Sequence, residues 1–162
     1  MAELPEWGPR FLEQRRIATI ATIEADGSPH VVPVWYLFRD GLLYVGTQSA
    51  SRKAKNATAR PRATLTVDSR EPGTERFVSG SGPATILRGD EARAIVAAVH
   101  ERYLTGDARS DPRVGGALAA ADDVVIAIRP SIWRAGASAE LDAQFFGGLL
   151  SATPQKWFRE LD

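Results

Sequence analysis

Residues 47–54 combine residue types that bind phosphate. They follow an apolar stretch with strand character and begin a stretch with helical character. The free backbone N–H groups of a helix's first turn, together with the helix dipole, favour an anion. Ser49 and Ser51 add hydroxyl donors, Arg52 adds a planar guanidinium fork, and Lys53 adds a compact charge. The segment therefore predicts a phosphate site, although these residues alone also fit a solvated basic helix with an ordinary serine cap.

Groups for other kinds of catalysis are scarce. The chain has no cysteine, which excludes disulfides, thiolate metal sites and cysteine nucleophiles. Its two histidines, His30 and His100, are far apart and show no metal-ligand spacing, so no metal site is expected. We expect a structural role for His100, on an apolar helix stripe, and a surface or cofactor-flanking position for His30. No carboxylate pair or Ser/His/Asp arrangement demands acid–base chemistry.

Length and composition are those of one soluble globular domain. The chain has 162 residues, of which 44% are apolar and 25% are charged. The 20 basic and 20 acidic side chains cancel, so no overall field attracts nucleic acid or an anionic membrane. No apolar run approaches the roughly 20 residues that span a bilayer, and the first residues lack a signal-peptide pattern. We expect a cytoplasmic protein without nucleic-acid or membrane partners.

The element pattern is mainly antiparallel β with a few helices. Strands are predicted where β-branched and aromatic residues lie between turn signals, and helices where apolar residues recur at helical spacing. Turns at Asp26-Gly27 and Asp40-Gly41 would join the first three strands into a meander. The expected strands are residues 17–23, 30–38, 42–47, 62–67, 77–87 and 124–128, and the expected helices are residues 5–16, 50–60, 90–103 and 114–121.

Local features refine this pattern. Gly80 and Gly82 predict a break or bulge in the fifth strand, and Asp90 is expected to cap the helix that follows. Residues 105–116 are expected to form a loop, and no strand pattern is present from residue 135 onward. Because the edges of about six strands must be protected, a closed or nearly closed barrel is predicted.

Three short motifs resemble the pyridoxamine 5′-phosphate oxidase-like split-barrel superfamily of flavin and deazaflavin oxidoreductases. They are residues 26–36 (Asp-Gly-Ser-Pro-His-Val-Val-Pro-Val-Trp-Tyr), 51–54 (Ser-Arg-Lys-Ala) and 60–63 (Arg-Pro-Arg-Ala). The resemblance implies a six-stranded antiparallel split β-barrel of FMN-binding type over residues 1–135. It also implies a homodimer with the cofactor in a cleft between subunits. The tail, residues 136–162, would pack on the barrel or on the partner.

The same resemblance implies a set of cofactor contacts. The strand against the isoalloxazine ring would supply Val31, Val32, Pro33, Val34, Trp35 and Tyr36. The ribityl chain and phosphate would contact Gly46, Thr47, Gln48, Ser51, Arg52 and Lys53, and Trp133 would reach the partner's cofactor. Pro33 lacks an N–H, so its strand is either irregular, with free donors for a ligand, or an edge strand. Tyr36 is either a proton donor near the ring or a core aromatic.

The sequence departs from the founding oxidase of that superfamily at two places. Arg76-Phe77-Val78 stands where that oxidase has a glutamine near the flavin, and the tail lacks its substrate-gripping histidine. Oxidation of pyridoxamine phosphate is therefore not expected. The resemblance instead implies an oxidoreductase that transfers a hydride between deazaflavin (F-420) or FMN and a small organic substrate. The alternatives are a non-catalytic dimer that stores or senses flavin or heme, and a structural dimer with a degenerate site.

Overall fold

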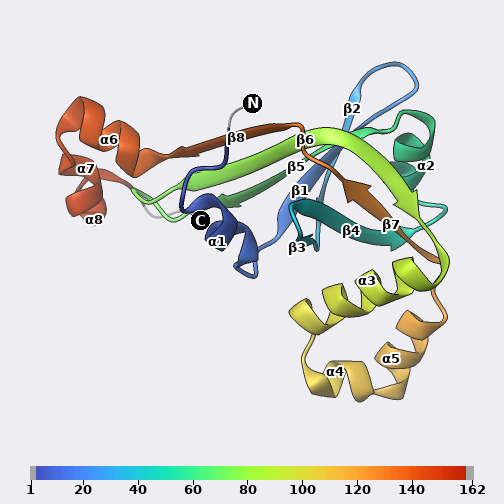
Figure 1. Ribbon diagram of the computed structural model, residues 1–162. Coiled ribbons are helices and arrows are strands. Elements are labelled where there is room, and N and C mark those ends of the chain that lie inside the picture. Colours follow the sequence, from blue (N-terminus) through green and yellow to red (C-terminus); the bar gives the residue numbers. More distant parts are fainter. Residues whose placement is uncertain (1–2, 160–162) are drawn as a thin grey trace.

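The computed structural model describes residues 3–159 as antiparallel strands with flanking helices (Figure 1). The strands are β1 Ala18–Ile23, β2 Pro29–Val34, β3 Leu37–Arg39, β4 Leu42–Gln48, β5 Arg62–Ser69, β6 Arg76–Leu87, β7 Asp123–Ile128 and β8 Ile132–Ala137. The helices are α1 Gly8–Glu13, α2 Arg52–Ala59, α3 Gly89–Tyr103, α4 Gly106–Ser110, α5 Pro112–Ala119, α6 Ser138–Phe146, α7 Leu149–Ala152 and α8 Pro154–Trp157. Within residues 3–159, no helix is long and apolar enough to cross a membrane.

The long strand β6 belongs to two sheets. Hydrogen-bonded neighbours follow the order β2-β1-β5-β6-β7-β4-β3, and β8 pairs with β6 outside this order. The first part of β6 lies between β5 and β8, whereas its end pairs with β7. The two sheets diverge along this shared strand and form a half-barrel. The predicted class, a mainly antiparallel split barrel with flanking helices, is confirmed, with eight strands rather than six.

The two faces of β7 fix helix α3 in place. Ile126 and Ile128 are fully buried in the main core of the barrel. Val125 faces the other way and packs against Ile95 and Val96 of α3. Because both faces are covered, β7 is buried along nearly its whole length. Helix α3 therefore lies firmly against the outside of the barrel, below β4 and β7 in Figure 1.

The segment expected as one strand over residues 30–38 is two strands. β2 ends at Val34 and β3 begins at Leu37, and the two lie at opposite ends of the strand order. Between them Tyr36 is fully buried, and its hydroxyl donates a hydrogen bond to the Leu12 carbonyl oxygen at 2.7 Å. At this buried residue the backbone leaves the sheet that contains β2 and enters the sheet that contains β3. The predicted meander is therefore wrong, since the first four strands form two separate hairpins.

β6 continues through Gly80 and Gly82, so the predicted break or bulge in it is wrong. Its register with β5 contains no extra residue. The extra residue lies in the facing chain, where residues 129–131 stand opposite Gly82 and Pro83 between β7 and β8. A Cβ on Gly82 would collide with the Arg129 carbonyl oxygen. Glycine is needed because another backbone comes close, not because β6 bends.

Two expectations about the helices around α3 are also wrong. Residues 105–116 are mostly helical rather than a loop, with Thr105 capping α4 and Asp111 capping α5. Asp90 lies inside the first turn of α3, and the cap position belongs to Arg88, which makes no side-chain cap bond. Helices α3, α4 and α5 form one group on the side of the barrel (Figure 1).

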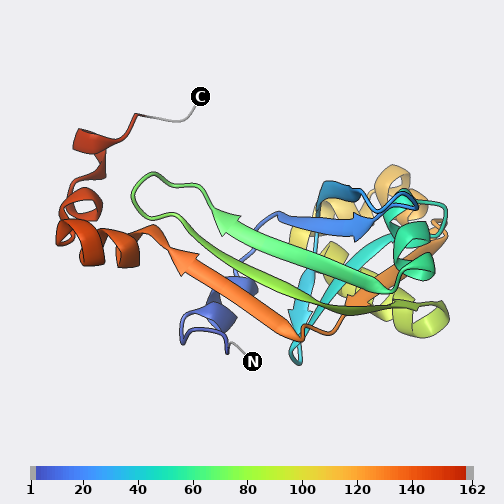
Figure 2. The same cartoon turned by 90° about the horizontal axis from the view of Figure 1, so that it is seen from above.

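β8 corrects the expectation that no strand extends past residue 135. It pairs with the first part of β6, and its side chains are exposed or half-buried, so no buried alternation marks it in the sequence. β5, β6 and β8 extend from the barrel as a ribbon with α6–α8 at its far end (Figures 1 and 2). The expected boundary at residue 135 falls inside β8, and the separate packing role of the tail remains a prediction.

Candidate functional site

The end of β4 and the start of α2 form one wall of a cavity of 360 Å³. The opposite wall comes from α3, from the start of β7 and from the link between β2 and β3. The lining residues are Trp35, Gly46, Thr47, Gln48, Ser51, Lys53, Val96, Val99, His100 and Asp123. Six of the thirteen residues that the sequence predicted as cofactor contacts therefore surround one space.

Ser51 occupies the cap position of α2. Its Oγ accepts hydrogen bonds from the Ala54 N–H at 3.3 Å and from the Thr47 hydroxyl at 3.0 Å. The backbone N–H groups of Arg52 and Lys53 precede the first intrahelical bond and are free to donate. The ordinary serine cap is present, and it leaves hydroxyl and N–H groups beside the cavity.

Lys53 is half-buried and lines the cavity. Its burial lowers the pKa of the ammonium group below 10.5. Among residues 3–159 no carboxylate lies within 4 Å of its ammonium nitrogen. A partly desolvated cation without an acidic partner would be stabilised by an anionic ligand.

Arg52 does not line the cavity and is mostly exposed. Its guanidinium lies 3.4 Å from the carboxylate of Glu24, at the end of β1. The same carboxylate lies 3.7 Å from His30 Nδ1. The sequence placed Arg52 among the phosphate ligands; in the structure it already holds a carboxylate, which a phosphate would have to replace.

Two polar contacts hold α2 against β1. The Asn56 amide donates to the Thr22 hydroxyl at 3.2 Å, and both side chains are buried. Arg60 Nε donates to the Ile23 carbonyl oxygen at 2.7 Å. These contacts hold the middle and the end of α2 against the sheet, which gives the candidate site a rigid wall.

The strand predicted to lie against a ring is an edge strand. β2 ends the strand order and pairs with β1 without interruption, Thr19 opposite Pro33. Of the two alternatives for Pro33, the structure has the edge strand. Val31 is 53% exposed, whereas Val34 is buried. Of the six residues from 31 to 36, Trp35 lines the 360 Å³ cavity.

Trp35 presents a flat aromatic surface beside the cavity. Its ring is stacked on Tyr103, with centroids 5.1 Å apart and planes within 1°. His100 meets the same ring edge-on at 6.5 Å. His100, expected to be structural, therefore lines the cavity as well as packing on an aromatic neighbour.

Tyr36 lies in the core and the half-buried Trp133 packs against it, and neither residue lines the cavity. Burial raises the pKa of Tyr36 to about 12, which matches the core alternative and not the proton donor. Trp133 packs edge-on against Phe38, with ring centroids 6.3 Å apart. Its expected contact with a partner's cofactor remains a prediction.

Two acidic residues at the start of β7 complete the site. Asp123 lies opposite Gln48 in the pairing of β7 with β4 and lines the cavity. Burial raises the pKa of its carboxyl group, while the neighbouring His100 acts in the opposite direction. The Asp122 carboxylate accepts a hydrogen bond from the Ser49 hydroxyl, so this serine is engaged within the protein. Among the described residues, no group of three or more His, Asp or Glu side chains could hold a metal ion.

Comparisons with known proteins fit this geometry. A family model described as pyridoxamine 5′-phosphate oxidase matches residues 9–135, a range that contains every residue lining the cavity. The chain belongs to the pyridoxamine 5′-phosphate oxidase-like family. The match covers β1 to β7, and with them the two sheets and helix α3 that surround the site in this family member.

Relatives in this family include deazaflavin-dependent enzymes. A biliverdin reductase of Mycobacterium tuberculosis, dependent on reduced F-420, is 36% identical over 106 residues, which is 64% of this chain and 73% of that protein. A solved structure of a conserved hypothetical protein from Mycobacterium tuberculosis has a TM-score of 0.70 at 29% identity, covering 86% of this chain and 88% of that one. An F-420 reductase has a TM-score of 0.62 at 25% identity, covering 81% and 98%.

Proposed function

We propose that this protein is an oxidoreductase that transfers a hydride between a bound deazaflavin F-420, or FMN, and a small organic substrate. The observation that carries the proposal is the cavity at the start of α2, where Lys53 is half-buried without an acidic partner. Similarity to two F-420-dependent reductases favours the deazaflavin over FMN. The substrate of the biliverdin reductase makes a conjugated acceptor the first class to test.

The donor set around the cavity fits a phosphate-bearing cofactor. Lys53 supplies a charge, Ser51 and Thr47 supply hydroxyls, and the start of α2 supplies N–H groups. Trp35 adds a flat aromatic wall of the kind that a ring system packs against. The Asp123 carboxylate lines the same space at the start of β7, and burial raises the pKa of its carboxyl group.

The protein's own part in the reaction is binding, orientation and exclusion of water. When bound, the cofactor supplies the hydride donor or acceptor. Lys53 and Ser51 would hold the phosphate, and the rigid attachment of α2 to β1 would fix its position. Val96 and Val99, buried on α3, form an apolar part of the wall that would exclude water from beside a bound cofactor.

Titration of the apo-protein with F-420 and with FMN, side by side, tests the proposal. Binding is followed by absorbance at about 420 nm for F-420 and about 450 nm for FMN. Lys53→Ala should lose about 1.5–3 kcal/mol of binding free energy, the worth of a charged hydrogen bond. Lys55→Ala is the matched control, because Lys55 is exposed on the same helix and does not line the cavity.

Three outcomes separate the hypotheses. Tight binding with hydride transfer to a conjugated acceptor supports the oxidoreductase. Tight binding without turnover across several acceptors would favour a storage or sensing role. Failure of both cofactors to bind, or equal affinities of the Lys53→Ala and Lys55→Ala variants, would contradict the site.

A further inference from the structure

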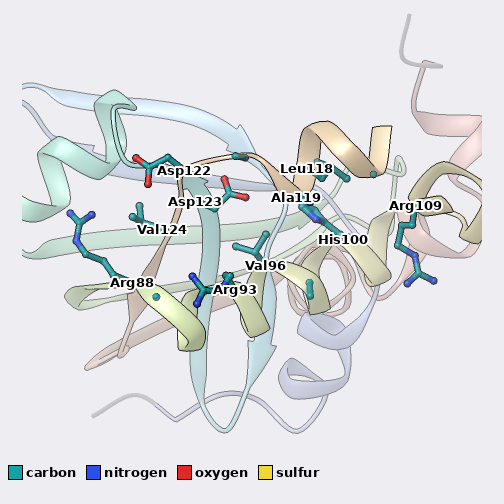
Figure 3. A pocket seen from close by; sticks show the side chains of 14 residues that line it. Arg88, Arg93, Val96, His100, Arg109, Leu118, Ala119, Asp122, Asp123 and Val124 are labelled. Carbon is teal, nitrogen blue, oxygen red and sulfur yellow. The ribbon is translucent and has the colours of Figure 1, made fainter. Parts of the chain in front are cut away.

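A second, larger cavity adjoins the proposed cofactor site. It has a volume of 690 Å³, lies between α3, α5 and the start of β7, and is drawn in Figure 3. That volume is within the usual range of small-molecule sites. Val96, His100 and Asp123 line both cavities. A molecule in the larger cavity would therefore lie next to the cofactor, with His100 between them.

Guanidinium groups lie at both ends of this cavity, with Arg88 at one end and Arg109 at the other, on the side of His100 (Figure 3). Arg88, Arg93 and Arg109 line it, and Figure 3 shows Arg88 and Arg93 on the side of α3, facing the acidic start of β7. Arg93 is ion-paired with Asp90. Within residues 3–159, neither Arg88 nor Arg109 has a carboxylate within 4 Å. Two guanidinium groups are thus available to an anionic ligand.

The side shared with the cofactor cavity has the opposite charge. Asp123 belongs to the shared lining, and Asp122 lies next to it. Carboxylates repel an acidic group placed beside them, so the acidic groups of a ligand are favoured beside Arg88 and Arg109 rather than beside Asp123. The walls between these two regions are apolar, formed by Val96, Leu118 and Val124. They fit an apolar body between the acidic groups of a ligand.

We infer that this cavity is the substrate site and that it selects an organic acid. Its carboxylate groups would lie against Arg88 and Arg109, and its apolar body between α3 and α5. That body would pass His100, which also lines the proposed cofactor cavity. The substrate role rests on the proposed function, but the binding of an apolar carboxylate does not.

Calorimetry on the apo-protein tests the binding directly, with a naphthalene dicarboxylate and its neutral diamide as probes. The dicarboxylate should bind more tightly than the diamide. Arg88→Gln and Arg109→Gln should each weaken it roughly two- to fivefold, the range for exposed charge pairs, and added salt should weaken it further. Arg113→Gln is the matched control: it removes the same charge from α5, but Arg113 is paired with Asp111 and does not line the cavity.

Several results would overturn the inference. These are absence of dicarboxylate binding, equal binding of the diamide, or an equal effect of Arg113→Gln. In the cofactor-loaded enzyme, Arg88→Gln and Arg109→Gln should raise KM for a carboxylate-bearing acceptor and leave KM for a neutral acceptor unchanged. If no cofactor binds but the arginine variants still weaken binding of the dicarboxylate, the proposed function and the substrate role fail. The assignment of the cavity as a binding site for an organic acid then stands. If the cofactor binds and the variants have no effect, the cavity assignment alone fails.

Discussion

The proposed contact between the half-buried ammonium of Lys53 and a phosphate predicts that cofactor binding depends on pH. Its folded pKa is lowered by burial, and a phosphate favours the charged form. Affinity is therefore complete below that lowered pKa and falls as the pH rises through it. We expect the Kd for FMN to rise before the pH reaches 10.5, the ordinary lysine value. Lys53→Arg should lack this rise, because a guanidinium stays charged throughout.

Comparing the wild type with Lys53→Arg isolates the effect of deprotonating Lys53 on cofactor affinity. Ionisation of the flavin itself affects both titrations equally, so only the difference between wild type and Lys53→Arg is interpreted. Fluorescence titrations at several pH values from about 7 to about 10 give this difference. Identical pH profiles would show that Lys53 does not hold the phosphate.

The site residues that could be predicted from the sequence are those that belong to one local motif. Thr47, Ser51 and Lys53 were predicted because a strand end followed by a helix start is a local pattern. His100 and Asp123 were not predicted as site residues, since they arrive through the packing of α3 and through the pairing of β7 with β4. Such contacts join segments more than 40 residues apart, and no local motif encodes them.

At the level of elements, Ser51 has two separable roles at the start of α2. Ser51→Ala removes the acceptor for the Ala54 N–H, so we expect a loss of about 1 kcal/mol of unfolding free energy. Ser51→Asp keeps a good cap and favours the helix dipole, but its carboxylate would repel a phosphate. The aspartate variant should therefore keep its thermal stability and lose cofactor affinity.

Thermal melts and cofactor titrations of both Ser51 variants measure these two roles. Ser49→Ala is the control, because the Ser49 hydroxyl donates to Asp122 and does not line the cavity. A Ser51→Asp variant that binds FMN as tightly as wild type would place the phosphate elsewhere.

Element prediction succeeded where the burial pattern along the chain is regular. β1 and β5 alternate between buried and half-buried residues, and both begin within one residue of expectation. Prediction failed at Tyr36, where burial of one side chain divides an apolar run between two sheets. It also failed at β8, which is held by its pairing with β6 and not by a buried face.

At the scale of the whole molecule, α6–α8 present a group of exposed apolar side chains. Leu141, Phe145, Phe146 and Leu149 are each more than half exposed. The turn between α6 and α7 is nevertheless fixed, because the buried Asp142 carboxylate accepts the Ser151 N–H at 2.7 Å. A fixed element with an apolar surface of this kind is typical of a protein–protein interface.

We therefore expect the terminal helices to pack on a second copy of the chain. Sedimentation equilibrium should give a dimer for the wild type and weaker association for the double variant Phe145→Ser, Phe146→Ser. Both side chains are exposed, so the variant should fold normally and keep its circular dichroism spectrum. A monomeric wild type, or a double variant with unchanged association, would exclude this interface.

The wall shared by the two cavities limits how the protein can change during evolution. Val96 and His100 are one helical turn apart on α3 and line both spaces. If the two cavities hold cofactor and substrate as proposed, a mutation at either position would alter both preferences together. Arg88 and Arg109 line the larger cavity alone. On the proposed assignment, substitution of these two arginines would change substrate preference without changing the cofactor cavity.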